Sequence, residues 1–143
     1  MAKPGWIRKF HKTSPEVTTP MLIFPHAGAG ASTYRELSKL LSTDFDVIVF
    51  QYPGRQDRVA EPPMTDLADI AAGAFTEFEA SEYNNGVPFM TFGHSLGGVT
   101  SFEFARLAEA AGLPQHQATI SAAVAPSRGC LLYTSPSPRD RTR

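Results

Sequence analysis

The stretch TFGHSLGGVTSF, residues 91–102, decides the fold. Its centre, Gly93 to Gly97, has the form G-x-S-x-G. The apolar run before it, residues 87–93, predicts a buried strand, and the periodic pattern after it predicts a helix. In a strand–turn–helix of this form the serine is held at strained dihedrals with its hydroxyl exposed. We interpret Ser95 as a nucleophile; the alternative is a turn of small residues that lets the helix pack closely.

Two further features support a nucleophile at this turn. In so tight a turn, Cβ atoms two residues before and after Ser95 would collide, which explains Gly93 and Gly97. The N-terminus of the following helix also favours developing negative charge. We therefore predict that the backbone N–H of Leu96 is one donor of an oxyanion hole.

A second donor is expected from the loop FPHAGAGAS, residues 24–32, which follows another apolar strand. We choose the N–H of Ala27, with Gly28 allowing the backbone to approach a substrate closely. The competing interpretation is a dinucleotide-binding loop. Its third glycine would fall at Thr33, and the next strand ends in Gln51-Tyr52 without an acidic residue for a ribose.

Strand and helix patterns alternate along the rest of the chain. Helical spacing predicts two apolar faces before the serine turn, one formed by Tyr34, Leu37, Leu40 and Leu41 and one running from Leu67 to Phe78. Besides the strand before the turn, buried strands are predicted at residues 21–24, 46–52 and 118–124. This alternation predicts an α/β fold with a parallel sheet and right-handed crossovers.

Composition limits the function classes. The chain has 143 residues, enough for one modest core and therefore one domain at most. Its net charge of -1 gives no reason to expect a nucleic-acid partner or an acidic membrane. One cysteine, Cys130, allows neither an internal disulfide nor a thiolate metal site, and we expect no metal. No signal core or transmembrane run is present, so we expect a cytoplasmic protein without a membrane partner, and a monomer.

The four histidines offer no convincing base for Ser95. His94 adjoins the serine, and neighbouring side chains at such a turn point apart. His26 can line the pocket, but it precedes the serine, whereas the partners of this turn follow in the order serine, acid, histidine. His11 is expected to be solvated, and His116 to lie in a polar surface connection. The triad aspartate and histidine are therefore expected outside this chain.

The end of the chain changes character. The segment SRGCLLYTSPSPRDRTR, residues 127–143, lacks periodicity, and residues 130–140 resemble the translation of a transposon-type sequencing adapter. We expect residues 1–127 to be the N-terminal part of a domain and residues 128–143 to be a non-native or disordered tail. The alternative is a genuine flexible tail. Asp140 is not interpreted as the triad acid merely because it follows the serine.

Four segments together resemble the type II thioesterases of nonribosomal peptide and polyketide synthesis. They are WIRKF, FPHAGAGASTYREL, VFQYPGRQDRVAEPP and FGHSLGGVTSFEFAR, in this order. The resemblance covers residues 6–127, roughly the N-terminal half of such an enzyme. One departure is Ala29, where the family often has glycine. WIRKF near a Met-led start favours a free-standing protein over a domain embedded in a synthase.

The resemblance implies an α/β-hydrolase fold, truncated after the helix that follows Ser95 and the next strand. It implies an enzyme that hydrolyses acyl or peptidyl thioesters from carrier proteins and so edits stalled synthases. The substrate would be carried on the phosphopantetheine arm of the carrier protein, and no cofactor of its own is expected. Ser95 would attack the thioester carbonyl, and the Ala27 and Leu96 N–H groups would hold the oxyanion. The lid and the triad acid and base belong to the part that is not represented.

Two other functions stay open. One is a carboxylesterase or lipase on the same fold, against which the block YPGRQDR, residues 52–58, argues. The other is a non-catalytic fragment that binds carrier proteins. The sequence assigns no chemical role to Arg55 or Arg58, and their simplest interpretation is a polar loop leaving a strand.

Overall fold

The computed structural model describes residues 5–26, 29–54, 56–58, 60–62, 64 and 66–121. It contains strands, α-helices and two short 3-10 helices in the order β1 (Ile7–Arg8), β2 (Pro20–Phe24), η1 (Ala31–Tyr34), α1 (Arg35–Leu41), β3 (Asp46–Phe50), η2 (Gln56–Arg58), α2 (Leu67–Glu79), β4 (Phe89–His94), α3 (Leu96–Ala110) and β5 (Gln115–Ser121). The boundary expected after residue 127 and the tail beyond it lie outside the described residues.

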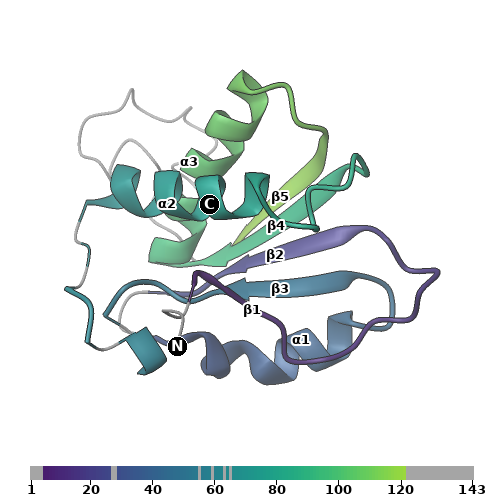
Figure 1. Cartoon of the computed structure of the whole chain (residues 1–143), viewed down its shortest axis with the longest axis horizontal. Coiled ribbons are helices and arrows are strands. Elements are labelled where there is room, and N and C mark those ends of the chain that lie inside the picture. The colour runs from purple at the N-terminus through teal and green to yellow at the C-terminus, as the bar shows by residue number, and fades with distance from the viewer. Residues whose placement is uncertain are drawn as a thin grey trace, which may run out of the picture.

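In the described part of the chain, five strands form one sheet in the order β1-β3-β2-β4-β5 (Figure 1). The strands β3, β2, β4 and β5 are parallel, which confirms the predicted α/β architecture. The exception is β1, which pairs antiparallel with β3 and is not among the predicted strands. Two residues are too short to show the alternation by which a strand is recognised.

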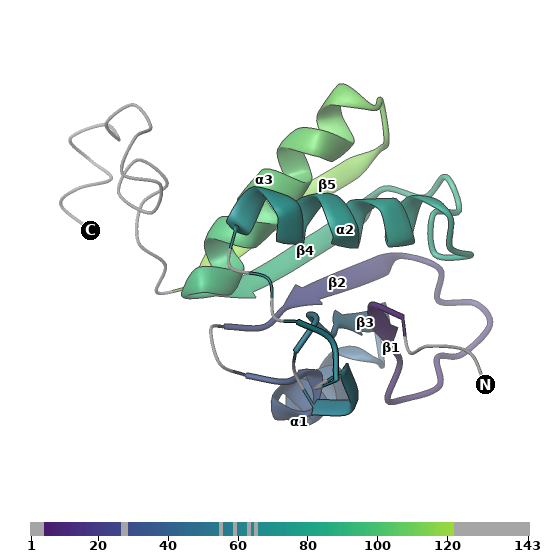
Figure 2. The same cartoon turned by 60° about the vertical axis from the view of Figure 1, so that its left-hand side comes forward.

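The strand order places a topological switch between β2 and β4. From β2 the chain moves to β3 on one side, and it then crosses to β4 on the other side. Phe24, the last residue of β2, pairs with Gly93 near the end of β4. Loops leaving such a pair open a crevice at the carboxyl edge of the sheet, where ligands bind in open α/β sheets. Figure 2 shows that β2 and β4 end at the edge where α3 begins.

Helices cover the two faces of the sheet unequally. Helices α2 and α3 lie on one face and α1 on the other (Figure 1). On the α2/α3 face, the ring of Phe104 lies between 5.1 and 5.9 Å, centroid to centroid, from the rings of Phe24, Phe50, Phe75, Phe78 and Phe89. On the α1 face, alternate residues of β2 and β3 pack against side chains of η1 and α1. The aromatic cluster therefore fixes α3, and with it the turn that precedes α3.

The predicted helix from Leu67 is confirmed. The Asp66 carboxylate caps it, accepting hydrogen bonds from the N–H groups of Ala68 and Asp69 at 2.8 and 3.4 Å. Helix α3 also follows the prediction, and Gly112 after it adopts a φ of 78°. The positive φ at that position suits glycine and ends the helix there.

Other expectations need correction. Leu40 is expected on the buried face of its helix, but its side chain is 73% exposed, and Ser38 is buried instead. The first turn of this segment is the 3-10 helix η1, so the face that begins at Tyr34 continues through Leu37 and Leu41 and turns away from Leu40. Strand β5 also begins earlier than expected, at Gln115 instead of residue 118. No helix in the described part of the chain is long and apolar enough to cross a membrane.

Candidate active site

Ser95 lies between β4 and α3 in a backbone conformation that residues other than glycine rarely adopt. Its φ is 58° and its ψ is -122°. Such a conformation costs of the order of 1–3 kcal/mol and persists only where the surroundings impose it. The Ser95 carbonyl accepts the N–H of Gly98 at 2.8 Å and so starts the first turn of α3. The strand and the helix on either side therefore hold the serine in place.

The two glycines of the turn are required by contacts with backbone atoms. A Cβ on Gly93 would lie 2.1 Å from the carbonyl oxygen of Gly97 and would therefore collide with it across the turn. A Cβ on Gly97 would lie 1.9 Å from the carbonyl oxygen of Phe24 in β2. The local geometry of the turn explains Gly93, whereas Gly97 is needed because α3 approaches a neighbouring strand.

Helix α3 begins at the carboxyl edge of the sheet, so its first N–H groups lie near Ser95. Leu96 is the first residue of the helix, where backbone N–H groups have no partner within the helix. Together with the helix dipole, this N–H is suited to bind an oxyanion beside Ser95. Ala27 and Gly28, proposed for the second half of the oxyanion hole, lie outside the described residues. The loop that carries them is described on both sides, at His26 and at Ala29.

Two tyrosines, to which the sequence analysis assigned no role at the site, hold the start of this loop. The Tyr34 hydroxyl accepts the backbone N–H of His26 at 3.2 Å and lies 2.5 Å from its Nδ1 atom. Which of the hydroxyl and Nδ1 donates depends on the tautomer of the His26 ring. Burial raises the pKa of Tyr34 above its ordinary value, which is already well above neutral pH, so the hydroxyl is uncharged there. The hydroxyl of Tyr52 donates to the carbonyl of Pro25 at 3.0 Å.

The histidines are distributed over the molecule. The rings of His26 and His94 meet edge to face with centroids 5.7 Å apart, and His94 directly precedes Ser95 in the chain. His11 is expected to be solvated; it is half-buried, with Nδ1 3.2 Å from the Ser38 hydroxyl on α1. His116 is expected in a connection, but it belongs to β5. Within the described residues, no group of three or more His, Cys, Asp or Glu could hold a metal.

Arg58 is a structural residue. Its side chain is almost buried, donates to both carboxylate oxygens of Glu61 at 2.8 Å, and donates to the carbonyl of Gln51 at 2.7 Å. Its guanidinium also lies 4.8 Å from the ring centroid of Trp6. Arg58 is expected in a polar loop leaving a strand; it lies in η2 after β3, and tertiary contacts bury its side chain. Arg55 lies outside the described residues.

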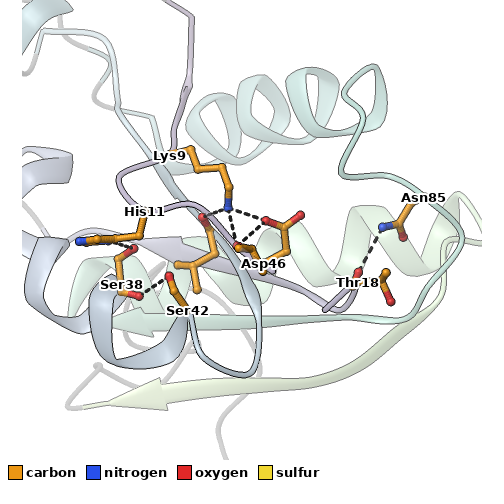
Figure 3. A network of polar contacts seen from close by, with 9 residues as sticks. Lys9, His11, Thr18, Ser38, Ser42, Asp46 and Asn85 are labelled. Carbon is orange, nitrogen blue, oxygen red and sulfur yellow. Dashed lines mark hydrogen bonds and ion pairs between the residues drawn. The ribbon is translucent and has the colours of Figure 1, made fainter. Parts of the chain in front are cut away.

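The opposite, amino edge of the sheet carries a different group of polar contacts (Figure 3). Lys9 forms an ion pair with Asp46 and donates to the Thr13 hydroxyl and to the Val47 carbonyl. Asn85 donates to the Thr18 carbonyl at 3.2 Å. A groove of about 700 Å³ lies here, lined in part by Lys9, Asp46 and Asn85. These groups are at the far ends of the strands from Ser95 and join the N-terminal segment to the sheet.

Comparisons with known proteins agree with this geometry. The thioesterase domain family matches residues 19–134. The chain is 41% identical over 123 residues to phenyloxazoline synthase MbtB of Mycobacterium tuberculosis, covering 85% of the chain and 8% of that protein. It is 36% identical to the thioesterase TesA of Mycobacterium marinum, covering 80% of the chain and 46% of TesA.

Solved structures give the same result. The type II thioesterase BorB from the borrelidin biosynthetic cluster superimposes with a TM-score of 0.78 and 39% identity, over 92% of this chain and 53% of BorB. YbtT, a type II thioesterase of the yersiniabactin pathway, superimposes with a TM-score of 0.76 at 22% identity, which supports the fold alone. The chain therefore spans about half the length of BorB.

The parallel sheet, the switch between β2 and β4 and the serine turn define an α/β-hydrolase fold. The chain belongs to the thioesterase domain family.

Proposed function

We propose that this chain supplies the nucleophile half of a type II thioesterase. The observation that carries the proposal is Ser95, held at a φ of 58° between β4 and α3 with the Leu96 N–H beside it, in a chain of the thioesterase family. Ser95 is the nucleophile, and the N–H groups of Leu96 and Ala27 form the oxyanion hole. Gly93 and Gly97 allow the tight turn, and Gly28 allows the loop backbone to approach the substrate closely.

The reaction has two steps. In the first, the Ser95 Oγ–H proton passes to a histidine base while Oγ bonds to the thioester carbonyl carbon. The oxyanion collapses, the carbon–sulfur bond breaks, and the departing sulfur takes the proton from the histidine. In the second, the histidine deprotonates a water molecule that attacks the acyl-serine, releasing the carboxylic acid and restoring the hydroxyl. We place that histidine and its aspartate outside residues 1–143.

The relatives support a substrate class. BorB is named as a type II thioesterase of a biosynthetic cluster. We propose that the substrate is an acyl or peptidyl thioester on the phosphopantetheine arm of a carrier protein, and that hydrolysis edits stalled synthases. The partner is then the carrier protein, the enzyme needs no cofactor of its own, and it acts as a monomer in the cytoplasm beside the synthase.

We further propose that residues 1–127 form the N-terminal part of the thioesterase domain and that residues 128–143 do not belong to it, although the family match extends to residue 134. We use the term parent protein for residues 1–127 of this chain together with the rest of that domain, as encoded by the same gene.

The test compares three proteins: this chain, the parent protein and the parent protein with Ser95→Ala. The substrates are an acyl-carrier protein and the matching oxygen ester. We expect the parent protein to hydrolyse the thioester, the Ser95→Ala variant to lose at least roughly 10³-fold in kcat, and this chain alone to show little activity, because a triad works as a unit.

Each alternative has its own outcome. A Ser95→Ala variant with the full rate contradicts the nucleophile, and a chain that equals the parent protein contradicts the placement of the acid and base. Preference for the oxygen ester indicates a carboxylesterase. Carrier-protein binding without hydrolysis by the parent protein indicates a binding module.

A further inference from the structure

The start of η1 is held by two glutamine side chains from a distant part of the sequence. The Oε1 atom of Gln51 accepts the backbone N–H of Ala31 at 2.7 Å. The Oε1 atom of Gln56 accepts the N–H of Ser32 at 3.3 Å. Gly30, at the N-cap position of η1, has no side chain to satisfy these N–H groups. The two glutamine side chains therefore accept the first N–H groups of η1, as the side chain of an N-cap residue does in other helices.

The two amides also bind each other. The Nε2 of Gln51 donates to Oε1 of Gln56 at 3.1 Å, and the Nε2 of Gln56 donates to the Ser32 hydroxyl. Gln51 is only 3% exposed. A buried amide whose oxygen accepts from one fixed partner and whose nitrogen donates to another is held in a single orientation. Such an amide rigidifies the backbone that it contacts. We name this pair, Gln51 and Gln56, the glutamine clamp.

Gly30 makes room for the clamp. A Cβ on Gly30 would lie 2.2 Å from Cγ and Cδ of Gln56, so the glutamine side chain occupies that space. Gln56 itself has a φ of 43°, in the left-handed region that residues with side chains rarely adopt. Arg58 then ties the segment to β3 through the carbonyl of Gln51. Two sequence blocks, residues 24–34 and residues 50–58, thus form one structural unit.

The clamp holds one end of the loop that carries the proposed oxyanion donor. At the other end, Tyr34 binds the N–H and ring of His26, and Tyr52 binds the carbonyl of Pro25. Between them, the Ala29 N–H donates to the His26 carbonyl at 3.1 Å. The backbone on both sides of Ala27 is therefore fixed relative to β2 and β3, and β2 is the strand that α3 touches at Gly97.

We propose that Gln51 and Gln56 are positioning residues for the oxyanion hole, acting through the loop before η1. This inference rests on the proposed function. An oxyanion donor is effective only if it is fixed before charge develops, so a loosened loop weakens binding of the transition state more than binding of the substrate. Loss of the clamp should therefore lower kcat and leave KM almost unchanged.

The experiment uses four variants of the parent protein. Gln51→Met and Gln56→Met keep the length of the side chain and remove its hydrogen bonds. Gln56→Glu keeps the acceptor at an exposed position and is the conservative rescue. Gln115→Met is the matched control, because the Gln115 side chain also hydrogen-bonds to the backbone, here by donating to the Ala105 carbonyl, but away from the loop.

We expect roughly a 10-fold loss of kcat in Gln51→Met and Gln56→Met, with KM changed by less than about 2-fold. Gln56→Glu and Gln115→Met should stay within about 2-fold of the parent protein in both constants. Hydrogen exchange of this chain should show faster exchange at the N–H groups of Ala31 and Ser32 in the two methionine variants, with β2 and β4 unchanged.

The outcomes separate this inference from the proposed function. If Ser95→Ala abolishes hydrolysis while both methionine variants keep kcat, the positioning role is wrong and the proposed function stands. An equal loss in Gln115→Met would mean that general destabilisation explains the effect, which also overturns the inference. If Ser95→Ala is fully active, the proposed function fails, and unchanged exchange at Ala31 would then also refute the clamp. Should Gln51→Met not fold, the exposed Gln56→Met decides.

Discussion

The two edges of the sheet are built in different ways. At the carboxyl edge, Ser95 is held in a strained conformation and Gly97 allows α3 to touch the backbone of β2. At the amino edge, Lys9 and Asp46 connect segments through side-chain contacts that are partly exposed (Figure 3). Backbone contacts at van der Waals distance leave no room for adjustment, whereas half-exposed side chains can exchange a partner for water. Substitutions at the carboxyl edge should therefore be the costlier ones.

The largest effect is expected for Gly97→Ala. The new Cβ would lie 1.9 Å from the Phe24 carbonyl oxygen, so α3 or β2 must move. We expect the free energy of unfolding to fall by at least about 3 kcal/mol. Urea unfolding of this chain, followed by the fluorescence of Trp6, its single tryptophan, measures the change.

The control for this prediction is Gly86→Ala. Gly86 has a φ of 85°, but a Cβ added there would meet nothing within 4 Å. The substitution should cost only about 1 kcal/mol, through the backbone conformation alone. Equal costs at the two positions would show that close approach of α3 to β2 is unimportant.

A smaller effect of opposite sign is expected for Ser95→Gly. Glycine adopts a φ of 58° without the steric cost that serine bears there. We expect the variant to be more stable by about 1 kcal/mol, while the parent protein loses its hydrolytic activity. Paired unfolding and rate measurements test both parts. A destabilised Ser95→Gly variant would mean that the turn stores no strain.

At the amino edge, Lys9→Met is expected to cost about 1 kcal/mol or less, because the ion pair with Asp46 is partly exposed. The cost should shrink as salt is added, since salt screens such pairs. Arg106→Met is the control: Arg106 is 61% exposed in its pair with Glu103, so its loss should cost less. A cost at Lys9 that does not depend on salt would contradict an electrostatic role.

At neutral pH the smallest effect is expected at Tyr83, beside the same groove. Burial, with the nearby charges of Glu82 and Asp46, raises the pKa of Tyr83 to about 12. The unfolded chain loses this proton near pH 10, so between about pH 10 and 12 the folded state holds more protons. The contribution to stability is therefore complete below pH 10 and is lost as the pH rises through 12. Spectrophotometric titration of the chain and of Tyr83→Phe shows the shift; a Tyr83 that titrates near pH 10 would refute it.

The sequence predicted the parts of the fold that depend on neighbouring residues. The periodicity of residues 67–78 indicated α2, and the apolar runs indicated β2, β3 and β4. The glycine spacing around residue 95 predicted a turn between strand and helix, and the structure has that turn. The assignment of Ser95 as nucleophile stays a prediction that the kinetic experiments test. Each of these features depends on steric limits and hydrophobic periodicity within about ten residues.

Tertiary structure alone decided the rest. It buried Arg58, exposed Leu40 and added β1 to the edge of the sheet. It also brought Gln51 to the N–H of Ala31, a contact between residues 20 positions apart. Nothing in the local pattern of either segment indicates such a contact. Hydrogen bonds of this kind require β2 to lie beside β3 and β4 in the sheet. The local sequence therefore determined the turn that holds Ser95, whereas strand pairing determined which residues surround that turn.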